Sequence, residues 1–197
     1  MMMVRKNKCS FIIIVTIGIL ALGCNSPSVP KPRGYFRIDF PEKQYKRFDS
    51  IYPFTFNYPV YGKVNVEKKM GQEGDWLNID FPNYNARIHL SYKDVSGNLS
   101  IMTEDARTLA YKHTVKADAI DERVFSSPEK KVYGILYDIK GNSASSLQFF
   151  LTDSVRHYIR GALYFRCQPN ADSLAPAVNF FEKDVIELIE SLEWKKK

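Results

Sequence analysis

The stretch Trp76–Tyr92 reads WLNIDFPNYNARIHLSY, and its pattern indicates the class of fold. Apolar residues occupy alternate positions on both sides of the turn-forming run Pro82–Asn85. Successive residues of a β-strand point to opposite faces, so each half presents one apolar face to a core and one polar face outward. Two such strands joined by a short turn are typical of an antiparallel sheet.

The chain repeats this pattern on both sides of the stretch. Alternation is found at 54–58 and 61–67 before it, and in four further segments between 119 and 165 after it. Segments near 103–116 and 172–192 have helical patterns instead. We therefore predict an α+β fold, with a mostly antiparallel sheet of about seven or eight strands and packed helices. The order of these elements is similar to that of the PsbP/Mog1 type of α/β/α sandwich.

Both predicted helices carry start signals. Thr103 offers a hydroxyl N-cap and is followed by two acidic residues, which the helix dipole favours in a first turn. We expect this helix to run to about Lys116. Asp172–Pro176 opens the second helix, with proline suited to the first turn. Apolar residues at spacings of three and four predict that this helix lies on the sheet through Leu174, Val178, Phe181, Val185, Leu188 and Leu192.

Residues 1–23 have the features of an export signal. Three basic residues precede an apolar run of 12 residues, Phe11–Leu22, which is shorter than the roughly 20 residues of a membrane-spanning helix. The run ends in LALGC, residues 20–24, which resembles the lipobox of bacterial lipoproteins; Ala21 stands where leucine is commoner. The resemblance implies that Cys24 is lipidated, becomes the mature N-terminus and is held on a membrane by acyl chains such as palmitate.

Removal of the signal changes the charge and the cysteine count. The whole chain has 28 basic and 22 acidic residues; the signal takes away three basic residues and no acidic one, which leaves +3. This small excess, without a recognisable motif, does not support nucleic-acid binding. Cys9 is removed and Cys24 is acylated, so Cys167 cannot form a disulfide within the mature chain. We expect Cys167 to be a small buried residue at the end of a strand rather than a nucleophile.

Residues 24–53 separate the signal from the domain, which we expect to span 54–197. Residues 25–33 hold three prolines and are interpreted as an extended tether. The rest interleaves basic and aromatic residues, which can contact lipid headgroups or a protein partner, or can wrap the domain with the aromatic side chains buried. The candidate contact residues of this segment are Arg33, Tyr35, Phe36, Arg37 and Tyr45.

The polar face of the stretch quoted first is the best candidate interaction surface. It consists of Trp76, Asn78 and Asp80 on one strand and Arg87 and His89 on the next. Trp76 and Arg87 are its candidate contact residues. The histidines at positions 89, 113 and 157 show no metal-ligand spacing, and neither a nucleophile elbow nor a phosphate loop is present. We therefore predict no catalytic residue, no metal, no cofactor and no enzymatic activity.

The pattern Asp-Ser-aliphatic occurs three times, at Ser50, Ser154 and Ser173. It resembles the O-glycosylation acceptor of periplasmic proteins of the Bacteroidota. The same residue types are routine in Asx-type turns and helix caps. Both interpretations stay open from the sequence alone.

The run Pro32–Pro41, PRGYFRIDFP, resembles the opening of the mature domain in the gliding-motility lipoprotein D family (GldD) of the Bacteroidota. The blocks Lys130–Gly134 and Phe149–Asp153 fit the same family, as does the C-terminal helix. The resemblance implies a noncatalytic envelope lipoprotein that gliding requires, linked to the assembly or stability of the type IX secretion and motility machinery. Its implied partners are the membrane, through the lipid, and protein components of that machinery.

Two further expectations concern the location of the protein and an alternative function. Some Bacteroidota lipoproteins carry an acidic cluster directly after the lipidated cysteine that sends them to the cell surface. This chain has none after Cys24, which favours the periplasmic side of the outer membrane. The alternative hypothesis is a periplasmic lipoprotein that binds a small ligand or a lipid in an apolar pocket between helix and sheet.

Overall fold

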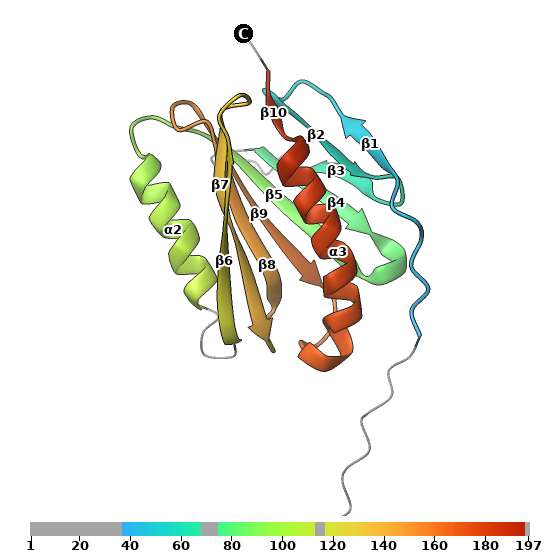
Figure 1. The fold of residues 1–197 in the computed structure, drawn as a ribbon. Coiled ribbons are helices and arrows are strands. Elements are labelled where there is room, and N and C mark those ends of the chain that lie inside the picture. The colour runs from blue at the N-terminus through green and yellow to red at the C-terminus, as the bar shows by residue number, and fades with distance from the viewer. Residues whose placement is uncertain (1–36, 68–74, 113–116, 196–197) are drawn as a thin grey trace, which may run out of the picture. The chain divides into compact units, whose positions relative to one another are not determined.

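The alternating strands form two antiparallel sheets in the computed structural model, which describes residues 37–67, 75–112 and 117–195 (Figure 1). The larger sheet has seven strands in the order β3-β4-β5-β9-β8-β7-β6. These strands are β3 (Lys63–Glu67), β4 (Asp75–Phe81), β5 (Ala86–Asp94), β9 (His157–Phe165), β8 (Ser145–Thr152), β7 (Val132–Gly141) and β6 (Ala117–Ser127). The predicted α+β fold with a mostly antiparallel sheet is confirmed.

A second, three-stranded sheet was not predicted from the sequence. In it, β2 (Phe54–Pro59) pairs with β1 (Tyr45–Phe48) on one side and with β10 (Glu193–Trp194) on the other. The first three residues of β2 are all buried, although a strand with one solvent face would alternate. β2 is therefore covered on both faces, and it joins the first and last parts of the described chain.

Helix α2 (Leu99–Tyr111) begins four residues before the predicted start at Thr103. That prediction is wrong because the Thr103 hydroxyl donates to the carbonyl of Ser100 at 3.0 Å, inside the helix, and does not cap its N-terminus. The predicted end near Lys116 lies outside the described residues. A short 3-10 helix, η1 (Pro82–Tyr84), connects β4 to β5.

Helix α3 (Ala171–Ser191) confirms the predicted apolar face. The side chain of Asn170 caps it by accepting from the backbone N–H of Ser173 at 3.0 Å, and Pro176 lies in the second turn instead of the first. The buried residues of the predicted stripe are Phe181, Val185, Leu188 and Leu192. The carboxylate of Asp184 is buried beside this stripe, which the apolar pattern did not predict.

The two helices cover opposite faces of the large sheet (Figure 1). Leu136 and Phe149 belong to the core cluster of α3 and the smaller sheet. Their sequence neighbours Tyr137 and Phe150 belong to the cluster of α2. Because neighbouring residues of a strand point to opposite faces, the large sheet lies between the two helices.

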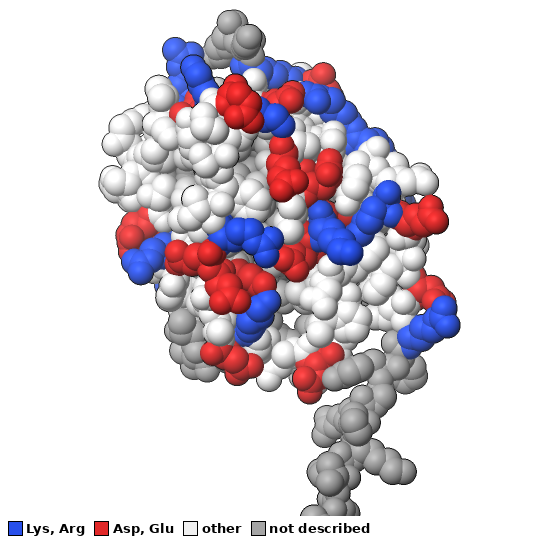
Figure 2. All heavy atoms as spheres, in the orientation of Figure 1, with Lys and Arg blue, Asp and Glu red and all other residues white. Residues whose placement is uncertain are grey.

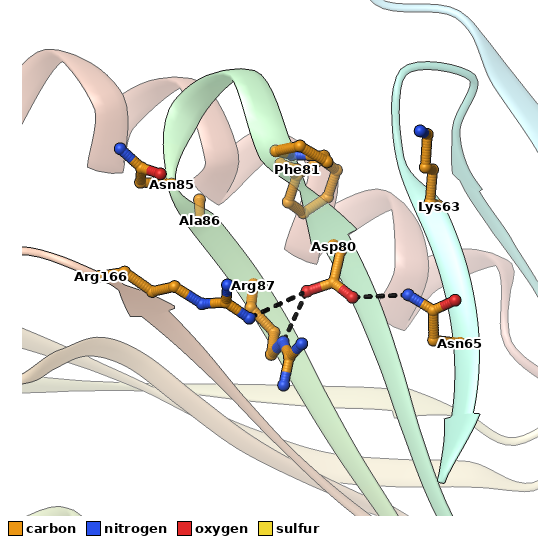
Figure 3. Close-up of a pocket in the computed structure, with 9 residues that line it drawn as sticks. Lys63, Asn65, Asp80, Phe81, Asn85, Ala86, Arg87 and Arg166 are labelled. Atoms are coloured by element: carbon orange, nitrogen blue, oxygen red, sulfur yellow. Dashed lines mark hydrogen bonds and ion pairs between the residues drawn. The ribbon is translucent and has the colours of Figure 1, made fainter.

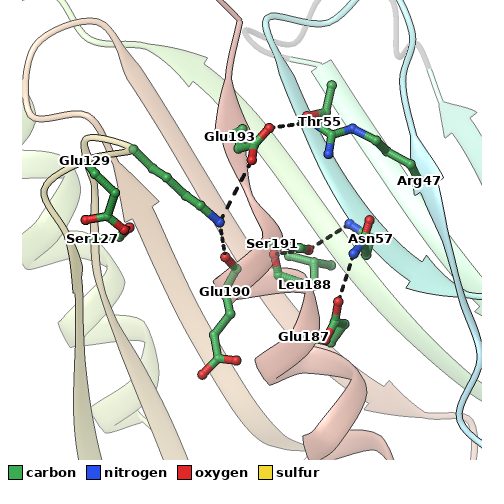
Figure 4. A network of polar contacts seen from close by, with 11 residues as sticks. Arg47, Thr55, Asn57, Ser127, Glu129, Glu187, Leu188, Glu190, Ser191 and Glu193 are labelled. Carbon is green, nitrogen blue, oxygen red and sulfur yellow. Dashed lines mark hydrogen bonds and ion pairs between the residues drawn. The ribbon is translucent and has the colours of Figure 1, made fainter.

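The compact unit includes the described residues from Arg37 onward, and so extends before Phe54, where the sequence suggested that the domain begins. β1 supplies one reason, because it pairs with β2 along its whole length. Side chains supply another: Arg47 Nη2 donates to Glu193 Oε2 at 2.5 Å and to Thr55 Oγ1 at 2.7 Å (Figure 4). The basic-aromatic segment from Arg37 onward is thus part of the domain.

Candidate functional site

The sheet places the five residues of the predicted interaction surface side by side. β4 pairs with β5 so that Asn78 lies opposite His89 and Asp80 lies opposite Arg87. Together with Trp76 they form what we call the polar sheet face. The alternation of the strands puts them on the same side of the sheet as α2, which packs on the neighbouring residues Tyr137, Phe150 and Tyr158.

The polar sheet face is more buried than the sequence pattern predicted. Asn78 is 0% exposed, and its Oδ1 lies 2.5 Å from Nδ1 of His89. The Trp76 ring is tilted over the His89 ring with their centroids 4.7 Å apart. The expectation of an exposed face is therefore wrong at Asn78, which the structure buries completely.

Asp80 is the polar centre of the face (Figure 3). Its Oδ1 accepts from Nε of Arg87 at 2.6 Å, and its Oδ2 accepts from Nδ2 of Asn65 at 2.6 Å. Nη2 of Arg166 lies 3.8 Å from the same Oδ1. Burial acts to raise the pKa of Asp80, but the hydrogen bonds and the two guanidinium charges outweigh it and lower that pKa. The carboxylate therefore favours its ionised form, hydrogen-bonded to Arg87 and in a longer ion pair with Arg166.

A hollow of about 390 Å³ opens beside Asp80. We call it the cationic hollow, because three basic side chains and one carboxylate line it. Its lining residues are Lys63, Asn65, Asp80, Phe81, Pro82, Asn85, Ala86, Arg87 and Arg166. In Figure 3, Lys63 projects from β3 and Arg166 from beyond the end of β9, on either side of Asp80.

Arg166 and Lys63 were missed as site residues by the sequence reasoning. Arg166 comes to the hollow because β9 pairs with β5, and its backbone N–H donates to the carbonyl of Asn85 at 2.7 Å. No local sequence pattern predicts that segments so far apart in the sequence pair with each other. Lys63 lies within the predicted alternating segment 61–67, where a lysine is ordinary, so only its strand pairing with Asp80 shows its role.

The N-terminal candidate contacts fall into two groups. Arg33, Tyr35 and Phe36 lie outside the described residues, as does Cys24. Arg37 is exposed and pairs with Asp39 at 2.9 Å. Tyr45 is half-buried, and its hydroxyl donates to Oδ1 of Asp184 at 3.0 Å. Tyr45 thus contacts the domain itself, which agrees with the interpretation that this segment wraps the domain.

A buried polar cluster anchors that segment to α3. Nζ of Lys43 donates to Oδ2 of Asp184 at 2.7 Å and lies 3.1 Å from the centre of the Phe180 ring. The Tyr61 hydroxyl donates to the same Oδ2 at 2.6 Å. Burial lowers the pKa of Lys43 against the opposing effect of Asp184, and burial together with Asp184 raises the pKa of Tyr45 and Tyr61. These groups form a structural clamp, which we call the Asp184 clamp.

The remaining candidate residues lie apart from the hollow. Ser154 and Ser173 are exposed and Ser50 is half-buried. Asp153 accepts the backbone N–H groups of residues 155–157, so the Asp-Ser pattern there forms an Asx-type turn, and glycosylation stays a prediction. Cys167 is exposed, so its predicted burial is wrong; it lies just after the end of β9.

The described ranges offer neither a metal site nor a membrane-spanning helix. Residues 37–67, 75–112 and 117–195 contain no group of three His, Cys, Asp or Glu side chains that could hold a metal ion. Neither helix in those ranges is both long and apolar enough to cross a membrane.

The fold and the site define a class of protein: an α+β sandwich with a charged, partly covered sheet face and a cationic hollow. Within that class, the family model for gliding motility lipoprotein GldD matches residues 25–194, and the chain belongs to this family. The chain is accordingly a lipoprotein of gliding motility associated with the cell envelope. No curated protein sequence matches it significantly.

One solved structure with a similar fold is the solution structure of cyanobacterial PsbP (CyanoP) from Synechocystis sp. PCC 6803. The likeness covers 88% of this chain and 99% of that chain, with a TM-score of 0.49 and 10% sequence identity.

Proposed function

We propose that this lipoprotein is a noncatalytic component of the gliding apparatus, anchored by lipid at Cys24 to the outer membrane and facing the periplasm. In this proposal it binds a protein of the motility and type IX secretion machinery and supports its assembly or stability. The observation that carries the proposal is the family match over residues 25–194. The polar sheet face and the cationic hollow supply a charged surface suited to a protein partner.

The alternative of a lipid-binding protein receives less support from the packing. Its pocket was expected between a helix and the sheet. Against α3 that space is filled, since Phe181 and Val185 are fully buried against the sheet residues of the same cluster. The hollow that does open is lined by charged side chains, which suits a polar group better than an acyl chain.

The test is a deletion of the gene in its own bacterium, complemented with the wild type or with Cys24→Ala. We expect the deletion to abolish colony spreading and to reduce export of a type IX substrate, and Cys24→Ala to restore neither. Cys167→Ala is the matched control, because it removes an exposed cysteine outside the signal and should restore both. Normal spreading in the deletion strain would refute the role in gliding. Lost spreading with normal export would refute only the link to secretion.

A further inference from the structure

The charges of the cationic hollow do not balance within the described part of the chain. Its lining has three basic side chains against the single carboxylate of Asp80. That carboxylate is already occupied, with Arg87 on one oxygen and Asn65 on the other, both at 2.6 Å. Nη2 of Arg166 lies farther from the Asp80 carboxylate, at 3.8 Å. The positive charges of Arg166 and Lys63 are therefore available to a bound group.

The two flanking cations are also accessible. The side chain of Arg166 is 66% exposed, and Lys63 is exposed on β3, the first strand in the order of the large sheet. Pro82, which is exposed, adds apolar surface to the lining, which suits the methylene groups of a glutamate side chain. Guanidinium groups bind carboxylates in a bidentate manner, and arginine is enriched in the contacts that dominate protein interfaces.

We propose that the cationic hollow binds an acidic segment of a protein partner, whose carboxylates pair with Arg166 and Lys63. Charge complementarity selects this occupant, because two added carboxylates bring the lining to neutrality. The volume of about 390 Å³ accommodates a few side chains, and the position beside an edge strand lets an extended segment approach. This proposal rests on the proposed function, because it specifies the chemistry of the partner that the lipoprotein binds.

The binding test uses the full-length lipoprotein in a non-ionic detergent at low salt. The probe is a fluorescein-labelled deca-glutamate peptide, followed by fluorescence anisotropy, with deca-glutamine as the uncharged comparison. We expect Arg166→Gln and Lys63→Gln each to weaken binding of deca-glutamate about tenfold, as lost charge-assisted hydrogen bonds do. Arg156→Gln and Lys93→Gln are the matched controls, since they remove the same charges from exposed positions outside the hollow.

Each outcome decides the proposal. Binding that is lost in the hollow variants and kept in the controls supports it. Equal affinity in all variants, equal loss in all variants, or no binding of deca-glutamate by the wild type overturns it. Binding to phosphatidylglycerol vesicles that depends on Arg166, without binding to the peptide, also overturns it in favour of a lipid headgroup. Unchanged thermal unfolding of the variants confirms that they are folded.

A cellular test separates this proposal from the proposed function. A photo-crosslinking amino acid at Asn85, on the rim of the hollow, should capture a partner peptide that contains Asp or Glu next to the crosslink; a basic or neutral peptide overturns the proposal. If Arg166→Gln spreads normally while Cys24→Ala does not, the hollow proposal fails and the proposed function stands. If the deletion strain spreads normally, the proposed function fails, and the peptide measurement still decides what the hollow binds.

Discussion

Replacing Lys43 by methionine should lower the free energy of unfolding by about 2–3 kcal/mol, because it leaves a buried carboxylate without its cation. The side chain of Asp184 is 0% exposed, and Lys43 is its salt-bridge partner at 2.7 Å. The same ammonium group also donates to the carbonyl of Phe180 at 2.9 Å. Methionine matches the length of the lysine stem, so the substitution removes the charge and the donors while keeping most of the apolar contacts.

The magnitude follows from how completely the pair is buried. Removal of one partner from a fully buried ion pair costs about 3–5 kcal/mol. Two features of the Asp184 clamp reduce that cost. Lys43 keeps 22% of its side chain exposed, and the hydroxyls of Tyr45 and Tyr61 continue to donate to the carboxylate after the substitution. A loss of about 2–3 kcal/mol should lower the Tm by about 4–12 °C in a domain of this size.

The assay is urea and thermal unfolding of the full-length lipoprotein in detergent, followed by far-UV circular dichroism. The control is Lys46→Met on the same segment, an exposed lysine whose Nζ lies 4.9 Å from the centre of the Tyr58 ring; we expect a change below about 0.5 kcal/mol. A double-mutant cycle with Asp184→Asn then isolates the pair, and we expect a coupling energy above about 1 kcal/mol. Additive effects of Lys43→Met and Asp184→Asn would refute the clamp, whatever the size of the single changes.

Three further predictions test the packing and the charges. Gly161→Ala should destabilise the domain by about 1–3 kcal/mol in urea unfolding, because the new Cβ would lie 2.1 Å from the fully buried ring of Phe149; an unchanged midpoint would contradict this close packing. Phe181→Ala should cost about 3–5 kcal/mol by opening a cavity under α3, and a loss below 1 kcal/mol would show that the site collapses. Because the pKa of Asp80 is lowered in the folded protein, its carboxylate stabilises the fold at pH values above its ordinary pKa of 3.8. This stabilisation is lost as the pH falls through the pKa of Asp80 in the folded protein. The Tm of Asp80→Asn should therefore fall less steeply than that of the wild type between about pH 5 and pH 2, and parallel curves would contradict the assignment.

Local patterns predicted the elements of the fold but not all of its pairings. Alternation of apolar and polar residues located the strands of the large sheet, and the spacing of apolar residues located the apolar face of α3. Both signals can be recognised within a single short segment of the sequence. The three-stranded sheet was not predicted, because it pairs β2 with Glu193–Trp194, which lie near the C-terminal end of the described chain. A two-residue strand carries no periodicity of its own.

The candidate site was predicted in part for the same reason. Asp80 and Arg87 are seven residues apart across one turn, so alternation alone placed them on one face. Arg166 and Lys63 complete the hollow through pairings that the sequence does not specify. The burial of Asp184 could not be predicted either, because an aspartate beside an apolar stripe is normally exposed and its compensating groups come from residues 43–61, far away in the sequence.

The Asp184 clamp and the cationic hollow lie on opposite faces of the large sheet, so loss of folding can be separated from loss of recognition. Asp184 lies on α3, which covers one face of the large sheet, whereas Asp80 and Arg87 lie on the opposite face with α2. Lys43→Met should therefore lower stability while the remaining folded protein binds deca-glutamate normally. Arg166→Gln should do the reverse, since an exposed side chain contributes little to stability. A gliding defect shared by both variants with normal protein levels would mean that the clamp also takes part in recognition, whereas a defect of Lys43→Met that follows protein abundance assigns it to folding alone.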